Sequence, residues 1–286
     1  MVLPIIIFHL GIKPYVEMCL RNATKYNKKV ILLTDQVNHY KSLHISNAEI
    51  IQVKDYQSYS QRFKYQHFSH NNPQLEYICI IRWMCIYEYM RKWGVPRAFI
   101  CDSDVLIYDD LDKIDQMWLS KYTCGLCSSP SQNVTGGQSI WSLEKLQQFV
   151  IFIISFYHRE INNMSQWFQE YKEPGGICDM TLLYYFIHNE KQFQGLRLPG
   201  YPQIKEDITV VHDQDIVIDL HMGSTGNHPY PDEWEMVTEN GVVRKKITFK
   251  DGSPYCYNKR LQKLIRFVLL HFQGVHKSVM ADYRSI

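Results

Sequence analysis

The sequence has no apolar run long enough to cross a membrane. Its longest such runs, Val2–Leu10 and Phe149–Tyr157, fall short of the roughly 20 residues that a transmembrane helix needs. It also lacks the basic N-terminal segment of a secretory signal peptide. We therefore expect a cytoplasmic protein without a membrane span, and contact with the inner face of a membrane stays open.

An excess of charge of either sign is also missing. Lysine and arginine number 31 against 29 aspartate and glutamate, which gives a net charge of +2. Such a balance argues against nucleic-acid binding through bulk charge. Aromatic residues make up 14% of the chain, which excludes a disordered or low-complexity protein because such chains lack core-forming side chains.

Several common cofactor and catalytic motifs are absent. The sequence contains no GxGxxG, P-loop or GxSxG pattern. Its single CxxC pair, Cys124 and Cys127, has no second pair at zinc-finger spacing. We therefore expect the eight cysteines to be structural thiols in a reducing compartment.

What the sequence does contain is an alternation of strands and helices. Val2–Phe8, Lys29–Leu33 and Ile50–Lys54 are β-branched or apolar runs typical of buried strands, and Pro14–Tyr26 has the apolar spacing of a helix. A strand–helix–strand order at the start of the chain predicts an α/β domain with parallel strands.

The later part of the chain continues this alternation and then changes character. We expect a helix at Glu76–Trp93, strands at Ala98–Cys101 and Tyr122–Cys127, a polar loop at Ser128–Gly137, and helices at Leu143–His158 and Cys178–Asn189. Residues 190–257 have frequent turn signals and short strands, which indicates a β-rich second part. We expect one domain over 1–286, with a first part at 1–110 and a second part at 111–286.

Two carboxylates follow the strand that ends at Cys101. Asp102 and Asp104 are two positions apart, so extended backbone would aim both side chains to one side. The C-terminal edge of a parallel sheet is where ligands bind, and paired carboxylates there suit Mg²⁺ or Mn²⁺ beside a diphosphate. The alternative is a turn with two solvated acids, since Asp and Ser favour turns.

A second motif, HFQGVHK, begins at His271 near the C-terminus. A neutral imidazole can bind a divalent ion, Gly274 lets the backbone approach a phosphate, and Lys277 can neutralise phosphate charge. Taken alone, a histidine after an apolar stretch is more often a core residue.

The DxD and HFxGxxK motifs together resemble those of glycosyltransferase family 8, which includes glycogenin and bacterial lipooligosaccharide galactosyltransferases. Arg82 on the helix before the DxD, the segment Asn133–Ser142, and Asp179 at a helix start fall in the family's order. The pattern departs from the family at Met180 and at Ser278-Val279. The resemblance implies a GT-A fold, which is a mostly parallel, Rossmann-like nucleotide-binding sheet with helices on both faces and a smaller β-rich acceptor-side part. It makes residues 1–110 the nucleotide-sugar-binding half and residues 111–286 the acceptor-side half, which carries the C-terminal metal and diphosphate motif.

The resemblance also implies a reaction and a set of site residues. The reaction is metal-dependent transfer of a sugar from a nucleotide-diphospho-sugar, usually UDP-linked, to a glycan or glycolipid acceptor in surface polysaccharide biosynthesis. The implied metal ligands for Mn²⁺ or Mg²⁺ are Asp102, Asp104 and His271, and the catalytic candidates are Asp179, Lys277 and Arg82. The implied donor-binding residues are His9, Leu10, Gly11, Asp35, Arg82, Ser103, Gly136, Gly137, Gly274 and Lys277.

Alternatives remain at this point. A retaining outcome fits the resemblance, but Asp179 could serve in a retaining or an inverting enzyme. A nucleotidyltransferase that forms sugar nucleotides would want a Gly-rich, basic loop after the first strand, of which residues 9–13 are a poor version. A non-catalytic nucleotide-sugar or glycan-binding protein is the third possibility. His221-Met222-Gly223 is a further candidate for acceptor contact.

Overall fold

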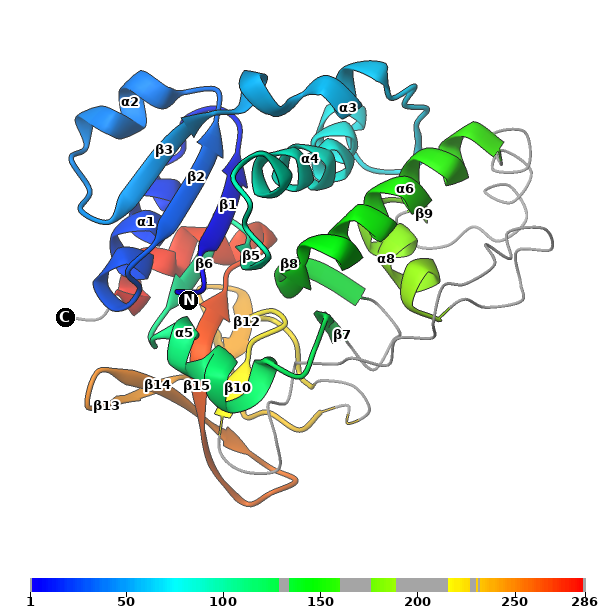
Figure 1. The fold of residues 1–286 in the computed structure, drawn as a ribbon. Coiled ribbons are helices and arrows are strands. Elements are labelled where there is room, and N and C mark those ends of the chain that lie inside the picture. Colours follow the sequence, from blue (N-terminus) through cyan, green and yellow to red (C-terminus); the bar gives the residue numbers. More distant parts are fainter. Residues whose placement is uncertain are drawn as a thin grey trace.

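The computed structural model describes residues 2–128, 134–159, 176–188, 216–226, 230 and 232–284. This part of the chain contains two main β-sheets, two small two-stranded sheets and the helices that flank them (Figure 1). The larger sheet has six strands in the order β3-β2-β1-β5-β8-β7. Its strands are β1 (Ile5–His9), β2 (Val30–Thr34), β3 (Ala48–Gln52), β5 (Arg97–Cys101), β7 (Cys124–Ser128) and β8 (Val134–Ser142).

The larger sheet is mostly parallel, as predicted. Strand β1 pairs in parallel with β2 and β5, and β2 pairs in parallel with β3. Strand β8 then runs antiparallel to both β5 and β7. The continuous apolar sequence of β1 and β2 suits strands that are covered on both faces. The predicted α/β class is therefore confirmed.

Helices cover both faces of this sheet (Figure 1). Ile5 and Ile7 of β1 face a core shared with α1 (Pro14–Tyr26) and the smaller sheet. Their neighbours Ile6 and Phe8 face the opposite core, built on α4 (Pro73–Lys92), α6 (Leu143–Arg159) and α8 (Asp179–His188). Because successive side chains of β1 point to opposite faces, this one strand contributes to both cores.

Helix α4 begins three residues earlier than the apolar pattern predicts. The side chain of Asn72 accepts hydrogen bonds from the backbone N–H groups of Gln74 and Leu75, and Pro73 occupies the first turn. The helix ends at Lys92, and Gly94 follows with a φ of +60°. These terminal signals place Arg82 near the middle of a 20-residue helix.

The smaller sheet has the order β10-β15-β14-β13, and β6 pairs with β15. Its strands are β6 (Val105–Ile107), β10 (Ile216–Ile218), β13 (Thr248–Lys250), β14 (Ser253–Asn258) and β15 (Lys263–His271). Val105 pairs with His271, and Leu106 with Leu270. This pairing brings Val105, the residue after Asp104, next to His271, the first residue of the C-terminal motif.

The remaining elements are short. They are α2 (Val37–Ser42), η1 (Val53–Tyr56), α3 (Ser58–Arg62), β4 (Phe68–Ser69), α5 (Leu111–Ile114), η2 (Asp115–Leu119), β9 (Gly176–Ile177), β11 (Met236–Glu239), β12 (Val242–Lys245) and η3 (Gly274–Tyr283). Strands β11 and β12 form a hairpin, and β4 pairs with β9. No helix among the described residues is both long and apolar enough to span a bilayer.

The predicted polar loop over Ser128–Gly137 is wrong at its C-terminal end. Strand β8 already begins at Val134, so Gly136 and Gly137 lie within a strand. A Cβ atom at Gly136 would overlap the indole ring of Trp83, and one at Gly137 would overlap the carboxylate of Asp102. The glycines therefore permit close tertiary approach and mark no turn here. Asn133, and every prediction within 189–215, lie outside the described residues.

A methyl group at Gly136 should destabilise the protein. Trp83 is fully buried between Trp141 and Phe149, so Gly136→Ala overpacks this core and should lower the free energy of unfolding by roughly 1–3 kcal/mol. Trp83→Phe removes the overlapping ring atoms. In a denaturation double-mutant cycle, Trp83→Phe should therefore recover part of the loss, and strictly additive effects would contradict the proposed overlap.

Candidate metal centre

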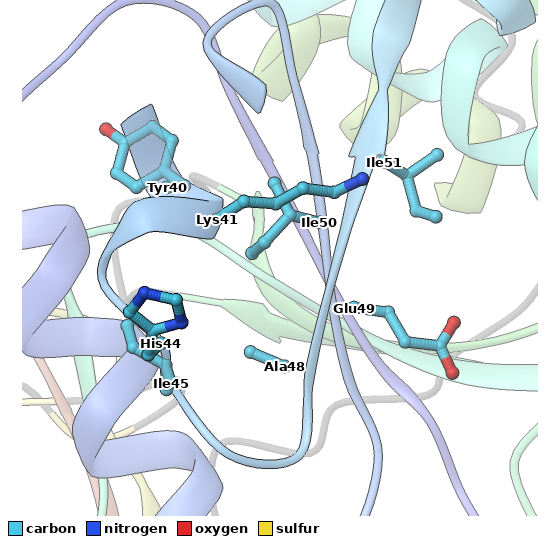
Figure 2. A pocket seen from close by; sticks show the side chains of 8 residues that line it. All are labelled: Tyr40, Lys41, His44, Ile45, Ala48, Glu49, Ile50 and Ile51. Atoms are coloured by element: carbon cyan, nitrogen blue, oxygen red, sulfur yellow. The ribbon is translucent and has the colours of Figure 1, made fainter. Parts of the chain in front are cut away.

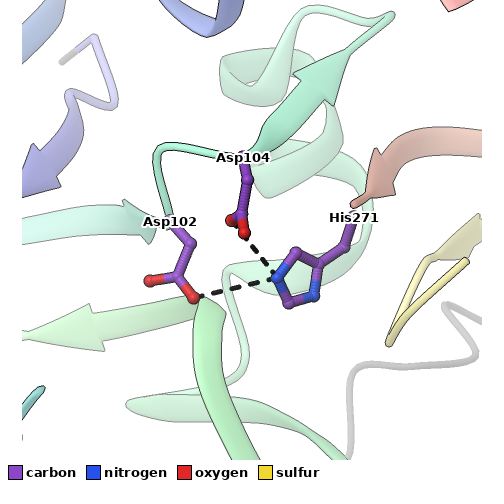
Figure 3. A group of neighbouring side chains, drawn as sticks. All are labelled: Asp102, Asp104 and His271. Carbon is purple, nitrogen blue, oxygen red and sulfur yellow. Dashed lines mark ion pairs between the residues drawn. The ribbon is translucent and has the colours of Figure 1, made fainter. Parts of the chain in front are cut away.

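Three potential metal ligands meet where the two sheets join. Asp102 follows β5, Asp104 precedes β6, and His271 ends β15. One ligand atom from each residue lies within 4.8 Å of the other two (Figure 3). The convergence expected from the sequence is therefore present, although the residues come from distant parts of the chain.

Backbone hydrogen bonds hold this arrangement. The N–H of Phe272 donates to the carbonyl oxygen of Asp104 at 2.9 Å, which extends the β6–β15 pairing to the carboxylate. The N–H of Asp102 donates to the carbonyl oxygen of Gly137 at 2.5 Å. Because Gly137 has no side chain, the Asp102 carboxylate can lie directly against β8.

Each carboxylate turns one oxygen to a cation and the other to His271. Asp102 pairs with Arg82 through Oδ1, and its Oδ2 lies 3.8 Å from His271 Nε2. Asp104 pairs with Lys277 through Oδ2 at 2.8 Å, and its Oδ1 lies 3.4 Å from the same nitrogen. Figure 3 shows both carboxylates facing the imidazole edge.

The protonation of the His271 ring follows from its other nitrogen. Nδ1 lies 2.7 Å from the carbonyl oxygen of Leu220, which can only accept, so Nδ1 carries a proton. Nε2 is buried and has no hydrogen-bond partner among the described residues. In the neutral ring its lone pair therefore points at two carboxylate oxygens, which repel it, so a cation at that edge is favoured.

Without a metal, that cation is a proton. Burial lowers the pKa of His271, but the negative charges of Asp104 and, to a lesser extent, Asp102 raise it more strongly, to about 9. Burial raises the pKa of Asp104, but His271 and Lys277 together hold it well below its usual range. At neutral pH the metal-free cluster therefore contains an imidazolium at His271 beside an ionised Asp104.

The same three atoms fit a divalent metal ion. Mn²⁺ and Mg²⁺ favour carboxylate oxygens, and a neutral imidazole nitrogen completes many divalent sites. The orphaned Nε2 of His271 is the group that such an ion would satisfy. The side chains of Asp104 and His271 are 8% and 2% exposed, whereas Asp102 is 27% exposed, so the cluster is reached from the Asp102 side.

Lys277 lies beside this cluster on η3. Its ammonium pairs with Asp104 and lies 5.4 Å from the ring centroid of Tyr15. Burial lowers the pKa of Lys277, but Asp104 raises it by more than burial lowers it. The pKa is therefore raised overall, and the side chain stays charged. Gly274 begins η3 with a φ of +62°, a conformation that favours glycine.

Arg82 bridges two acids that are far apart in the sequence. One guanidinium nitrogen pairs with Asp102 and another with Asp179 Oδ2 at 2.6 Å. Trp83 Nε1 also donates to Asp179 Oδ2, at 3.4 Å. Burial raises the pKa of Asp179, and Arg82 opposes that shift. Arg82 thereby ties the start of α8 to the carboxylate cluster.

The residues expected at the nucleoside side lie around the ends of β1 and β2. His9 Nδ1 is 2.9 Å from the hydroxyl of Ser103, and the His9 ring meets Tyr15 edge-on. The N–H of Gly11 donates to Asp35 Oδ1 at 2.7 Å. Burial lowers the pKa of His9 to about 4, so its ring is neutral. The neighbouring Leu10 packs against the core on the α4 side.

Other site residues could not be found from the sequence. Tyr15 lies between His9 and Lys277, and Gln138, Asp219 and Lys245 surround the backbone that holds His271. Tyr15, Asp219 and Lys245 lie in no short motif, because they come from α1, from the residue that follows β10 and from β12. Gln138 lies within the segment Asn133–Ser142, to which the resemblance gave no such role. His221, the acceptor-contact candidate, has its ring centroid 6.0 Å from that of His271; its contact with an acceptor stays a prediction.

A separate cavity of about 340 Å³ lies between α2 and the edge strand β3 (Figure 2). Tyr40, Lys41, His44 and Glu49 give it polar edges, and Ile45 and Ile50 give it apolar walls. None of the predicted site residues lines it.

Comparison with protein-family models and with curated proteins finds no match. Solved structures with some likeness include mouse xyloside xylosyltransferase 1 (TM-score 0.43, 10% identity, 64% of this chain and 80% of that one). They also include an active-site mutant of LgtC (0.37, 15%, 63% and 68%). A third is a cytidylyltransferase from Leptospira borgpetersenii (0.33, 11%, 58% and 73%). All three TM-scores lie below 0.5, so neither fold nor function rests on them.

Metal binding should release a proton from His271. Since the pKa of His271 is raised to about 9, the ring is charged at pH 7.5, and a metal must displace about one proton. At the unperturbed pKa of about 6.5, the release would be about a tenth of a proton. Calorimetry of Mn²⁺ binding in buffers of different protonation enthalpy measures this number.

Apparent metal affinity should accordingly rise with pH and level off above about 9. His271→Gln, which cannot carry the proton, should bind more weakly and release close to none. Wild-type protein that binds Mn²⁺ without proton release at pH 7.5 would contradict a His271 ligand that is an imidazolium before the metal binds.

Proposed function

We propose that this protein is a divalent-metal-dependent glycosyltransferase of the GT-A type. It transfers a sugar from a nucleotide-diphospho-sugar, a UDP-sugar, to a glycan or glycolipid acceptor. The observation that carries the proposal is the meeting of Asp102, Asp104 and His271 at the C-terminal edge of a parallel sheet. That edge is the usual ligand position in α/β sheets, and a diphosphate needs a cation there.

The chemistry to be catalysed is departure of a nucleoside diphosphate. A bound divalent ion supplies Lewis-acid stabilisation of the negative charge that develops on the leaving phosphate. Lys277 adds a fixed positive charge on the same side, because its ammonium lies 2.8 Å from Asp104. Charges placed before the reaction need no reorganisation during it, which makes such electrostatic stabilisation effective.

Asp179 and Arg82 are proposed to act on the sugar side of that bond. Asp179 Oδ2 is engaged by Arg82 and Trp83, which suits a fixed negative group better than a proton acceptor. A fixed carboxylate can stabilise an oxocarbenium-like centre while the leaving phosphate takes the acceptor proton. This arrangement favours the retaining outcome.

The nucleoside is proposed to lie over the ends of β1 and β2, where His9, Gly11 and Asp35 gather. We propose a single domain over 1–286, because one core contains residues of β1, α1 and β15. A cytoplasmic location, with peripheral contact at the inner membrane face, fits a glycolipid acceptor of surface polysaccharide biosynthesis.

The first loop argues against a sugar-nucleotide-forming nucleotidyltransferase. Such an enzyme would offer backbone N–H groups after β1 to a phosphate. Here the N–H of Gly11 donates to Asp35, and the carbonyl oxygen of Gly11 accepts from the Tyr40 hydroxyl. The loop is therefore closed on itself by side chains.

Incubation with a panel of nucleotide sugars and Mn²⁺ tests the proposal. We expect slow hydrolysis that releases nucleoside diphosphate from one donor, most readily a UDP-sugar, and no release without metal. Asp104→Asn should reduce this release to background. Release of pyrophosphate from a nucleoside triphosphate and a sugar phosphate would support the nucleotidyltransferase, and donor binding without turnover would support the non-catalytic alternative.

Lys277 variants test the charge that acts on the leaving group. Lys277→Ala should lower kcat by roughly 10²–10³-fold with a smaller change in donor affinity, because its charge matters most as the phosphate departs. Lys277→Arg should recover only part, since a planar fork differs from a compact point charge. Lys246→Met, on an exposed lysine paired with Glu235, is the control. Unchanged kcat in Lys277→Ala would contradict this role.

A further inference from the structure

An ion pair lies completely buried behind His271. Lys245 Nζ is 3.0 Å from Asp219 Oδ1, and both side chains are 0% exposed. Neither residue contributes a ligand to the Asp102–Asp104–His271 cluster. Both charges have therefore been removed from water at a position that the proposed mechanism does not use.

This ion pair holds the backbone segment 219–222 along the end of β15. Asp219 Oδ2 accepts the N–H of His271 at 3.1 Å, and Lys245 Nζ donates to the carbonyl oxygen of His221 at 2.5 Å. The backbone adds two bonds, from Lys245 N–H to the Met222 carbonyl and from Met222 N–H to the His271 carbonyl, each 2.9 Å. The segment is thus fixed to β12 and to His271 itself.

The same segment carries the carbonyl group that sets the His271 ring. Leu220 O accepts Nδ1–H of His271 at 2.7 Å and also the side-chain amide of Gln138 at 2.9 Å. That amide donates in addition to the carbonyl of Asp219, at 2.8 Å. Gln138 lies on β8 directly after Gly137, whose carbonyl holds Asp102. The side chain of Gln138 therefore connects the Leu220 carbonyl, which orients His271, to strand β8 beside Asp102.

A buried ion pair is weak evidence for stability, because the cost of desolvating two charges can exceed their attraction. An apolar pair of similar volume can stabilise a core equally well. What an apolar pair cannot do is anchor specific backbone groups through directed hydrogen bonds. The Asp219–Lys245 pair does this at two points, on both sides of the Leu220 carbonyl.

We propose that Asp219, Lys245 and Gln138 are positioning residues that hold the Leu220 carbonyl so that His271 presents Nε2 to Asp102 and Asp104. The inference rests on the proposed metal site. Groups that hydrogen-bond the far side of a histidine ligand fix its tautomer and direction, and their loss typically costs about 10–100-fold in metal affinity.

The test is Mn²⁺ affinity in the absence of any sugar nucleotide. Asp219→Leu/Lys245→Met removes both charges and their hydrogen bonds together, so no unpaired charge stays buried. We expect its Kd for Mn²⁺ to rise about 10–100-fold while thermal unfolding without metal remains cooperative. Asp219→Asn/Lys245→Gln keeps hydrogen-bonding groups without charge and should recover most of the affinity.

A matched control uses the next lysine along the chain. Lys246 pairs with Glu235 at the surface, so Glu235→Leu/Lys246→Met makes closely similar chemical changes away from the site and should leave the Kd unchanged. If Asp219→Leu/Lys245→Met folds and binds Mn²⁺ as tightly as this control, the inference is overturned.

Gln138→Met provides a second test that removes no charge. It deletes both hydrogen bonds to the 219–220 carbonyls and should weaken Mn²⁺ binding about tenfold, even if the double variant does not fold. Unchanged affinity in folded Gln138→Met would likewise overturn the inference. Wild-type protein that binds no Mn²⁺ would instead contradict the proposed function, which keeps the two failures distinct.

Discussion

The antiparallel pairing of β6 with β15 is the interaction on which the candidate site depends. It aligns Val105 with His271 and extends to the bond between Phe272 N–H and the Asp104 carbonyl. Strand β6 follows β5 of the larger sheet in the chain, whereas β15 is an inner strand of the smaller sheet. The junction of the two sheets therefore also creates the candidate metal centre. Any change that separates the sheets would separate the ligands.

Around that junction the position of each charge decides what it does. Arg82 and Lys277 neutralise the outer oxygens of Asp102 and Asp104, and the inner oxygens face His271 Nε2. The outer cations lower the cost of burying two acids. The two inner oxygens still favour a positive charge at His271 Nε2. In the metal-free protein that charge is a proton, and the pKa of His271 is therefore raised to about 9. A divalent ion competes for the same place.

Local patterns in the sequence predicted the α/β class and most strands of the larger sheet. The family resemblance implied Asp102, Asp104 and His271 as metal ligands, and their side chains meet in the structure. The early start of α4 could also have been predicted, because Asn72-Pro73 is a helix-capping signal. A prediction from the apolar pattern alone does not take that signal into account. The position of Gly136 and Gly137 in a strand was not predictable, since a glycine pair usually marks a turn. Here the two glycines leave room for the side chains of Trp83 and Asp102, which lie far away in the sequence. Asp219 and Lys245 have no local signature, because their pairing arises only when β12 meets the segment that follows β10. The roles of the donor-binding candidates stay predictions.

The central claim is that one cation joins the Asp102–Asp104–His271 cluster to the diphosphate of a donor. Calorimetric titration of UDP with and without saturating Mn²⁺ tests it most directly, with uridine as the control that lacks phosphates. Binding at one shared site requires that Mn²⁺ tighten UDP binding, by roughly 5–150-fold on the usual scale of coupling between ligands, and that it leave uridine unaffected. Equal UDP affinity in the presence and absence of Mn²⁺ would contradict the account.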